Sequence, residues 1–471
     1  MHRSFVVRLR ALAIGLALSP TLLLAQKPAA APAAPPRLKI PVTYLHLKNG
    51  LRVVIAPDQS VPTAAVAVYY GVGFRVEPKG RTGFAHLFEH MMFQGSKNLG
   101  KMAFVKLIEG SGGILNGSTR FDYTNYFEVV PANALETALW AESDRMRGLA
   151  ITQENLVNQQ GVVKNEVKVN VLNQPYGGFP WLDMPQLANT NWHNAHNFYG
   201  DLAELDAATL ADVQQFFTTF YAPNNASLVI AGDVDVKATK ALVEKLFGDI
   251  AAQPQPPKED LSEPRQDAEK RANKEDKLAP RPALAVSWHV PPRWTPEWFA
   301  FGIIDQLLAQ GRDSRLYDAI VRTKGYAGNV GAGINPGLGN QWNYAGPMLY
   351  TINLFHDAKT SPDTILAAMD VEIERLRTDL VDAPSLERAR TRWRSGFYSY
   401  IESLNGFGKA DILASLALFD DNPARINEIE KGMDAVTPEM IRKTAQEWLR
   451  RTNRSILTLV PAPKPAATGG H

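Results

Sequence analysis

The sequence contains no cysteine among its 471 residues. This absence excludes thiol nucleophiles, disulfide bonds, Cys-ligated zinc and iron–sulfur clusters. The charges nearly balance, with 50 Lys and Arg against 48 Asp and Glu. The composition therefore gives no electrostatic basis for nucleic-acid binding. Histidines number only 9. Any metal site must therefore be built from a few imidazoles and from carboxylates.

The N-terminal segment 1–25 has the pattern of a secretory signal peptide. Arg3, Arg8 and Arg10 precede an apolar run over positions 11–25 that is too short to span a membrane, which takes about 20 residues. An Ala/Pro-rich linker over positions 26–39 follows, and no later segment has an apolar run of spanning length. We predict cleavage, export to a periplasm and no stable membrane insertion afterwards; an uncleaved membrane anchor is the alternative.

Residues 253–282 are rich in proline and charge and poor in apolar side chains, which is typical of an interdomain linker. The flanking segments, 40–252 and 283–462, are each long enough for one core, and single cores stop growing at about 250–300 residues. The sequence therefore predicts two domains, followed by a short tail over positions 463–471.

The two predicted domains resemble each other. The apolar, strand-like run Ala65–Tyr70 is matched in the second domain by Ala283–Trp288. Near the domain ends, Thr209 and Thr437 each stand at a good N-cap position before an amphipathic helix and a short apolar strand. We interpret this as two copies of one α+β unit, with chance similarity of amphipathic patterns as the alternative.

One motif carries catalytic chemistry. His86 and His90 are four residues apart in a segment with a helical pattern, so both imidazoles project from one face and can bind a single zinc ion. Glu89 lies on the same side, where its carboxylate can deprotonate a water molecule whose pKa zinc lowers towards ~7. The order H-x-x-E-H is the inverse of the commoner H-E-x-x-H motif of zinc proteases.

The alternative is an amphipathic helix that merely carries polar positions, and the internal repeat argues against it. When Ala65 is aligned with Ala283, the three motif positions fall on Ile304, Leu307 and Leu308, so the second copy of this helix is apolar there. A helix that only packs has no reason to exchange core residues for His and Glu, because burying them unpaired is costly.

A site with two histidines needs a third protein ligand. Glu166 lies in a helical segment over positions 154–167, near the apolar positions Leu156, Val162 and Val163. Spacing alone leaves its role open, since acidic residues on helices are usually solvated.

The motif and its context, GFAHLFEHMMFQGS, resemble the inverted-motif zinc peptidases pitrilysin, insulysin and the mitochondrial processing peptidase. The resemblance covers positions 40–460 and implies two homologous α/β-sandwich domains, each an antiparallel-rich sheet with helices packed on it, enclosing a chamber. In length the chain is similar to the short, dimeric subfamily of the processing peptidase. The family's third ligand follows the motif in a V-[VI]-x-x-E pattern. The segment Val162–Glu166 matches this pattern. The resemblance therefore implies that Glu166 is a zinc ligand and that Glu89 is the general base.

The resemblance extends to Asn116 and Gly117. Their segment, GGILNGST, is similar to the family's G-x-x-N-A-x-T strand, with Gly117 in place of alanine, and implies an edge strand to which a peptide substrate adds. From the residues alone, Asn-Gly also predicts a hairpin turn. His193 and His196 are a second candidate pair of metal ligands. The family has a structural turn at this place, and the resemblance therefore implies that neither is a ligand.

Two departures from the family pattern concern the support of the site. Gln159 stands seven residues before Glu166, where the family usually has a second Glu that supports the zinc ligands. Arg322 matches an arginine that holds the substrate carbonyl, but the tyrosine expected seven residues later is replaced by Asn329, and Tyr326 is the nearest candidate.

The sequence therefore predicts an exported zinc endopeptidase that acts on short or unfolded peptides. The alternative is a peptide-binding or structural subunit that retains zinc but has little activity alone. Because one member of the Arg/Tyr pair is missing, we also predict a homologous partner subunit that supplies it, in a heterodimer rather than a homodimer; loss of such a donor typically costs about 10²–10³ in turnover.

Overall fold

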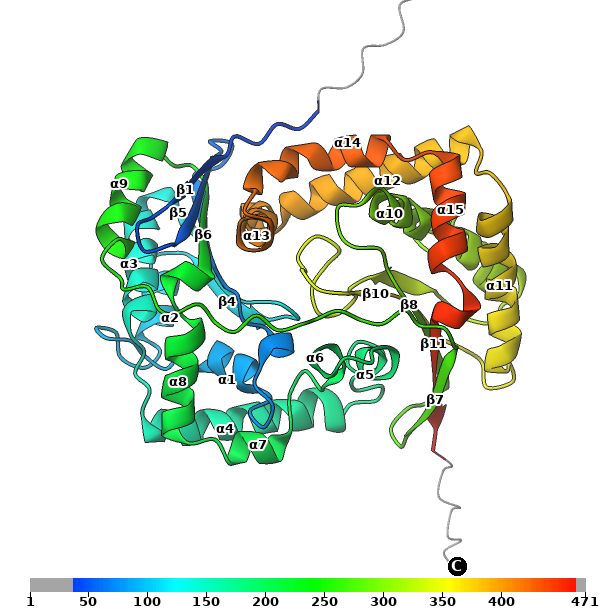
Figure 1. The fold of residues 1–471 in the computed structure, drawn as a ribbon, viewed down its shortest axis with the longest axis horizontal. Coiled ribbons are helices and arrows are strands. Elements are labelled where there is room, and N and C mark those ends of the chain that lie inside the picture. The colour runs from blue at the N-terminus through cyan, green and yellow to red at the C-terminus, as the bar shows by residue number, and fades with distance from the viewer. Residues whose placement is uncertain (1–36, 463–471) are drawn as a thin grey trace, which may run out of the picture. The chain divides into compact units, whose positions relative to one another are not determined.

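The computed structural model describes residues 37–462 of the chain. The predicted signal peptide, nearly all of the Ala/Pro linker and the tail over positions 463–471 lie outside this range. Within it, two β-sheets are present, and each is built from one half of the sequence. Figure 1 shows the two sheets with their helices.

The first sheet has six strands in the order β1-β2-β6-β3-β5-β4. β6 pairs parallel with β2, and the other neighbours are antiparallel. All residues of the central strand β3 except the first are buried, so both faces of the sheet are covered at its centre. The strands are β1 (Thr43–His46), β2 (Arg52–Pro57), β3 (Thr63–Tyr70), β4 (Ile114–Thr119), β5 (Thr124–Pro131) and β6 (Ala226–Gly232).

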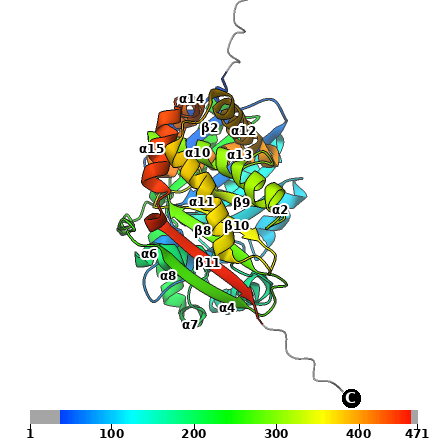
Figure 2. The same ribbon diagram turned by 90° about the vertical axis from the view of Figure 1, so that its right-hand side faces the viewer.

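The second sheet has five strands in the order β7-β11-β8-β10-β9. Here β7 pairs parallel with β11, and the remaining neighbours are antiparallel. Figure 2 shows β11 running beside β8. The strands are β7 (Lys270–Asp276), β8 (Ala283–His289), β9 (Gly331–Ile334), β10 (Leu349–Phe355) and β11 (Arg454–Pro461).

The two sheets have the same topology. β2-β6-β3-β5-β4 corresponds strand by strand to β7-β11-β8-β10-β9, including the one parallel pair in each, and β1 is an addition to the first sheet. The runs Ala65–Tyr70 and Ala283–Trp288 lie in the equivalent strands β3 and β8. The predicted α+β fold with two copies of one unit is confirmed.

The predicted linker over positions 253–282 needs correction. Positions 270–276 form β7, an edge strand of the second sheet. Exposure alternates along β7, so it behaves as a strand with one half-buried face although Lys, Arg, Glu and Asp dominate its composition. Pairing with the apolar strand β11 decides the structure of this segment, and its charges fit the need to protect a sheet edge.

The helices and helical turns of the first half lie between and after the strands of the first sheet in the sequence. The side chain of Thr209 accepts a hydrogen bond from the backbone of Asp212 at the start of α8, as predicted for an N-cap. The elements are η1 (Phe74–Val76), α1 (Phe84–Met91), α2 (Ala103–Gly110), η2 (Ala132–Ala134), α3 (Leu135–Arg147), α4 (Gln153–Val167), η3 (Lys168–Leu172), α5 (Asp183–Ala188), α6 (Trp192–Ala195), α7 (Leu202–Asp206), α8 (Leu210–Phe220), η4 (Pro223–Asn225) and α9 (Val236–Phe247).

The helices of the second half are longer. Thr437 caps α15 as Thr209 caps α8, which confirms the second predicted N-cap. The elements are α10 (Pro296–Leu308), η5 (Tyr317–Thr323), α11 (Pro362–Thr378), α12 (Ala383–Ile401), α13 (Ser403–Asp420), η6 (Pro423–Glu428), α14 (Ile429–Asp434), α15 (Pro438–Trp448) and η7 (Arg451–Asn453).

Each half contributes one helix that packs on the sheet of the other half. α13 of the second half packs on β3 and β6 of the first sheet, and α5 of the first half packs on β8 and β11 of the second (Figure 1). The first contact includes a buried polar cluster around Asp411. The second has an apolar centre that includes Met184 and Ala188, beside the ion pair of Asp183 with Lys274. The opposite face of the first sheet is covered by helices that include α1 and α8, through Phe88 and Phe216.

Candidate metal centre

The helix α1 begins at Phe84 because a buried carboxylate holds its first amides. Glu77 accepts hydrogen bonds from the backbone N–H groups of Gly83 (2.9 Å) and Ala85 (2.6 Å), where no side-chain cap is present. Burial raises the pKa of Glu77, against the opposing effect of His196. Gly83 has φ +83°, and a Cβ there would lie 2.6 Å from the carbonyl oxygen of Tyr199, so only glycine fits.

α1 presents its two imidazoles to α4. The rings of His86 and His90 have centroids 4.9 Å apart and planes at 84°. On the other side of the helix, Leu87, Phe88 and Met91 are buried in the core. One face thus anchors the helix by burial of apolar area, and the other is left for polar side chains.

Glu166, on α4, completes a group of three side chains that could hold a metal ion. Its Oε1 lies 3.5 Å from Nε2 of His86, and its Oε2 lies 3.1 Å from Nε2 of His90. One ligand atom from each residue lies within 4.8 Å of the others. Hydrogen bonds from His86 and then His90 lower the pKa of Glu166, so the carboxylate is ionised. Two imidazole nitrogens and one carboxylate oxygen are the donor set of a catalytic zinc site with an open position, and the residues therefore fit zinc.

Glu89, next to His90 on α1, contacts strand β4. Its Oε2 accepts a 2.7 Å hydrogen bond from the hydroxyl of Thr119, the last residue of β4. A Cβ at Gly117 would lie 3.3 Å from Cγ of Glu89 and 3.2 Å from the ring of Tyr126, so the backbone of β4 passes close to the carboxylate. A Cβ at position 117 would therefore require Glu89 or Tyr126 to shift by a few tenths of an ångström.

β4 is an edge strand of the first sheet, as the family resemblance implied. Asn116 and Gly117 lie inside the strand, paired with Phe127 and Tyr126. The alternative prediction of a hairpin turn at Asn116-Gly117 is wrong, because the turn between β4 and β5 lies at positions 120–123. The side chain of Asn116 is exposed, and its Oδ1 accepts from the N–H of Gly117.

Tyr199, which the sequence analysis did not single out, also contacts the group. Its hydroxyl donates to Oε1 of Glu166 at 3.5 Å, and its ring lies edge-on to His86 with centroids 5.1 Å apart. Burial, with the Glu166 carboxylate beside it, raises the pKa of Tyr199 above its ordinary value, so the phenol is a proton donor. A Tyr-Gly pair in a loop carries no chemical signature of its own, so only the tertiary structure reveals this contact.

Two other candidates from the sequence lie outside the metal group. Gln159 is buried, and its amide donates to the side chain of Asn158 at 2.7 Å rather than to Glu166. Arg322 is exposed and pairs with Asp318 at 2.6 Å, in the π-helical turn η5. Neither side chain therefore supports the three converging residues directly.

His193 and His196 also have partners outside the metal group. Nδ1 of His193 lies 2.7 Å from the carbonyl oxygen of Arg75, and Nδ1 of His196 lies 3.0 Å from that of Trp192. Nε2 of His196 lies 3.5 Å from Glu77, the residue that holds the start of α1. This histidine-containing turn thus supports the position of α1 indirectly.

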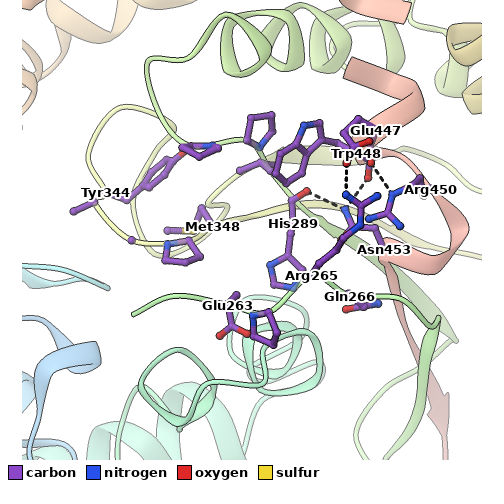
Figure 3. Close-up of a pocket in the computed structure, with 17 residues that line it drawn as sticks. Glu263, Arg265, Gln266, His289, Tyr344, Met348, Glu447, Trp448, Arg450 and Asn453 are labelled. Atoms are coloured by element: carbon purple, nitrogen blue, oxygen red, sulfur yellow. Dashed lines mark hydrogen bonds and ion pairs between the residues drawn. The ribbon is translucent and has the colours of Figure 1, made fainter. Parts of the chain in front are cut away.

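A cavity of about 470 Å³ lies in the second half, where β8 ends near α15 (Figure 3). Its wall includes His289, Tyr344 and Trp448, and at its rim Arg265 pairs with Glu447 at 2.5 Å. None of its lining residues belongs to the metal group. The candidate chemistry therefore lies on α1 and α4, apart from this cavity.

Comparison with known families agrees with the duplicated fold. Residues 52–178 match the family described as Insulinase (Peptidase family M16), and residues 207–392 match the Peptidase M16 inactive domain. The chain belongs to peptidase family M16. The first matched segment of this M16 protein contains His86, Glu89, His90 and Glu166, and the second lies mostly in the half without them.

Relatives of this M16 protein carry peptidase names. It is 26% identical over 428 residues to the zinc protease PqqE of Helicobacter pylori, covering 88% of this chain and 92% of the relative. It is also 26% identical over 211 residues to the probable mitochondrial-processing peptidase subunit beta of Arabidopsis thaliana, 44% of this chain and 39% of the relative. The crystal structure of a protease from Helicobacter pylori has the same fold, with a TM-score of 0.82 and 23% identity over 90% of this chain and 100% of that one.

Among the helices of residues 37–462, none combines the length and the apolar character needed to cross a membrane.

Proposed function

We propose that this protein is an exported zinc endopeptidase that hydrolyses short or unfolded peptides. The observation that carries the proposal is the convergence of His86, His90 and Glu166 from two helices, with ligand atoms within 4.8 Å, beside a carboxylate held by an edge strand. The relatives named zinc proteases support the same chemistry.

In this proposal the three converging residues hold zinc and Glu89 is the general base. Bound zinc would polarise the scissile carbonyl and make a water molecule acidic. Thr119 fixes one oxygen of the Glu89 carboxylate at 2.7 Å, so the second oxygen can accept the proton of that water and deliver it to the leaving amine. The Glu89 side chain is only partly buried, so its oxygen can reach a bound peptide.

The substrate would bind along β4. As the last strand of its sheet, β4 has one edge without a neighbouring strand among the described residues, and an extended peptide can pair there through backbone hydrogen bonds. Gly117 places this backbone against Glu89, so a peptide added at this edge would lie near the base. Backbone pairing tolerates many sequences but requires an extended chain, which favours short or unfolded peptides over folded proteins.

A second function, a peptide-binding or structural subunit that retains zinc but has little activity alone, is favoured by the second half. Arg322 is paired with Asp318, and the tyrosine expected near it is replaced by Asn329. A homologous partner subunit could supply the missing hydroxyl. We therefore propose a heterodimer, with a homodimer as the alternative; one relative of this chain is itself named as a peptidase subunit.

Export to a periplasm is supported by the N-terminal pattern alone, in which three arginines precede an apolar run over positions 11–25.

The test compares the wild-type chain with Glu89→Gln on an unstructured peptide. Glu89→Gln should retain one zinc by atomic absorption, because Glu89 is not a ligand, and should lose cleavage by several orders of magnitude. Cleavage by the wild type should stop with a chelator and return with zinc. Full activity in Glu89→Gln would rule out the mechanism. An inactive wild-type chain that holds zinc would favour the subunit function, and light scattering in the same preparation gives the oligomeric state.

A further inference from the structure

One oxygen of Glu166 is approached from two elements. Oε1 lies 3.5 Å from Nε2 of His86 and 3.5 Å from the hydroxyl oxygen of Tyr199, whereas Oε2 faces His90. The hydroxyl of Tyr199 therefore reaches a carboxylate oxygen that belongs to the metal group. The Tyr199 ring also lies edge-on to His86, so this residue contacts two of the three candidate ligands.

The position of Tyr199 is set by its own loop, between α6 and α7. Its backbone N–H donates to Oδ1 of Asn197 at 2.9 Å, and the next residue, Gly200, has φ +70°. A Cβ at Gly200 would lie 2.3 Å from the backbone N of Gly83, so the loop abuts the start of α1. Asp201 then donates its N–H to the hydroxyl of Thr82 at 2.9 Å. The loop and the helix that carries His86 are thus fixed against each other.

Aromatic packing fixes the ring itself. Phe198 lies edge-on to Tyr199 with centroids 5.0 Å apart, and Trp181 packs against both. A Cβ at Gly337, in the second half of the chain, would lie 2.6 Å from Cβ of Trp181, so a loop of the second half closes over this aromatic group. The hydroxyl is therefore held in place before any ligand binds.

Helix α4 itself gives Glu166 little support. Seven residues earlier, where the family pattern predicts a carboxylate, Gln159 uses its amide to bond Asn158. The side chain that does bond Glu166, besides the two histidines, comes from the Tyr199 loop. In this chain the hydrogen bond to Glu166 thus comes from a neutral hydroxyl on another element and not from residue 159 of the same helix.

We propose that Tyr199 is a positioning residue for zinc: its hydroxyl donates to Oε1 of Glu166 and fixes the carboxylate in the orientation that binds the metal. The inference rests on the proposed function of this site. A hydrogen bond to a ligand restricts its rotamers and satisfies the lone pairs that the metal does not use, and loss of such a bond typically weakens metal affinity about 10–100-fold.

The test is Tyr199→Phe, which removes the hydroxyl and keeps the ring that packs on His86. Zinc affinity, measured on the full chain by competition with a chromogenic chelator, should weaken about 10–100-fold. The unfolding midpoint of the metal-free protein should remain that of the wild type. The matched control is Tyr44→Phe, because the hydroxyl of Tyr44 also donates to a carboxylate, that of Asp421, but on β1 at the opposite edge of the first sheet.

The outcomes are distinct. Wild-type zinc affinity in Tyr199→Phe overturns the inference alone, and so does a fall in kcat at unchanged zinc affinity, because the hydroxyl would then act on the substrate. A wild-type chain that binds no zinc overturns the proposed function and this inference with it. Weakened affinity in Tyr199→Phe and unchanged affinity in Tyr44→Phe support the inference.

Discussion

The two halves of this M16 protein share one topology and differ in what their first helix does. α1 presents His86 and His90 to Glu166 of α4. The equivalent helix α10 is buried along most of its length and is enclosed by α12, α14 and α15. α12 contacts α10 through Trp393. This ring packs so closely on Gly302 of α10 that a Cβ there would lie 2.2 Å from it. The same framework therefore makes a polar site where the neighbouring helix supplies a carboxylate and an apolar core where it supplies Trp393.

The difference teaches that the site depends on the polar partners that neighbouring elements supply as much as on the three residues themselves. In the second half, Ile304 and Leu308 are fully buried, and a polar side chain at either place would have no partner. In the first half, partners for the imidazoles come from α4, and the partner for Glu89 comes from the edge strand β4. Exchange of residues between the halves should therefore fail in both directions.

The largest effect is expected for His90→Ala in the first half. Loss of one of the three proposed ligands should bring zinc well below one per chain and reduce peptide cleavage by more than the ~10²–10³-fold that loss of one transition-state donor costs. Atomic absorption and a cleavage assay measure both. Leu308→Ala, the matched change in the second half, should leave zinc content at the wild-type level. A His90→Ala protein with full zinc and full rate would break the comparison.

The next largest effect is expected when the histidine of position 90 is placed at the equivalent position 308 of the second half. Leu308→His should lower the free energy of unfolding by about 3 kcal/mol or more, because apolar packing is lost and an imidazole is buried without a partner. Urea unfolding measures it. Leu308→Met, which conserves volume, should cost less than about 1.5 kcal/mol. A Leu308→His protein as stable as the wild type would show that α10 can accept a polar face.

The third prediction is a smaller loss of stability and concerns α13, the helix of the second half that packs on the first sheet. Asp411 of α13 accepts hydrogen bonds from the hydroxyls of Tyr69 and Tyr400 and from the amide of Asn343, all buried or nearly so. Asp411→Ala should lower the free energy of unfolding by about 2–3 kcal/mol, since buried donors lose their acceptor.

Tyr400→Phe removes a single donor from the same cluster and should cost only about 1 kcal/mol. Equal unfolding midpoints for Asp411→Ala and the wild type would mean that α13 is held on the first sheet by its apolar contacts alone.

The smallest expected effect is a change of stability with pH that comes from the ion pair of Lys409 with Asp58, a second contact between the two halves. The ammonium of Lys409 on α13 holds the pKa of Asp58 at about 2, below its ordinary value of 3.8. A lowered folded pKa stabilises the fold above the unfolded pKa, and the contribution disappears as pH falls from about 4 to 2. Because Asp58 is partly exposed, the gain at neutral pH is about 1 kcal/mol at most.

Thermal unfolding of wild type and Asp58→Asn between pH 2 and 7 measures this contribution. The wild type should be slightly more stable at neutral pH, and the two curves should converge near pH 2. A constant difference over the whole range would assign the effect to something other than the charge of Asp58.

What the sequence by itself determined follows from short-range rules. Helical periodicity places residues four apart on one face, so the pairing of His86 with His90 could be predicted without a structure. The same holds for the caps at Thr209 and Thr437 and for the apolar strands, whose repetition along the chain revealed the duplicated fold. Glu166 needed the family resemblance, because no local rule separates a ligand from a solvated carboxylate on a helix.

Only the tertiary structure decided the features that depend on contacts between distant segments. The charged segment 270–276 became β7 because β11, at the far end of the described chain, offers it a partner. Asn116 and Gly117 lie in a strand and not in a turn because β5 pairs with them through Phe127 and Tyr126. Tyr199 reached Glu166 because its loop is wedged against the start of α1. Such contacts are set by packing between elements, and residue spacing along the chain contains no measure of them.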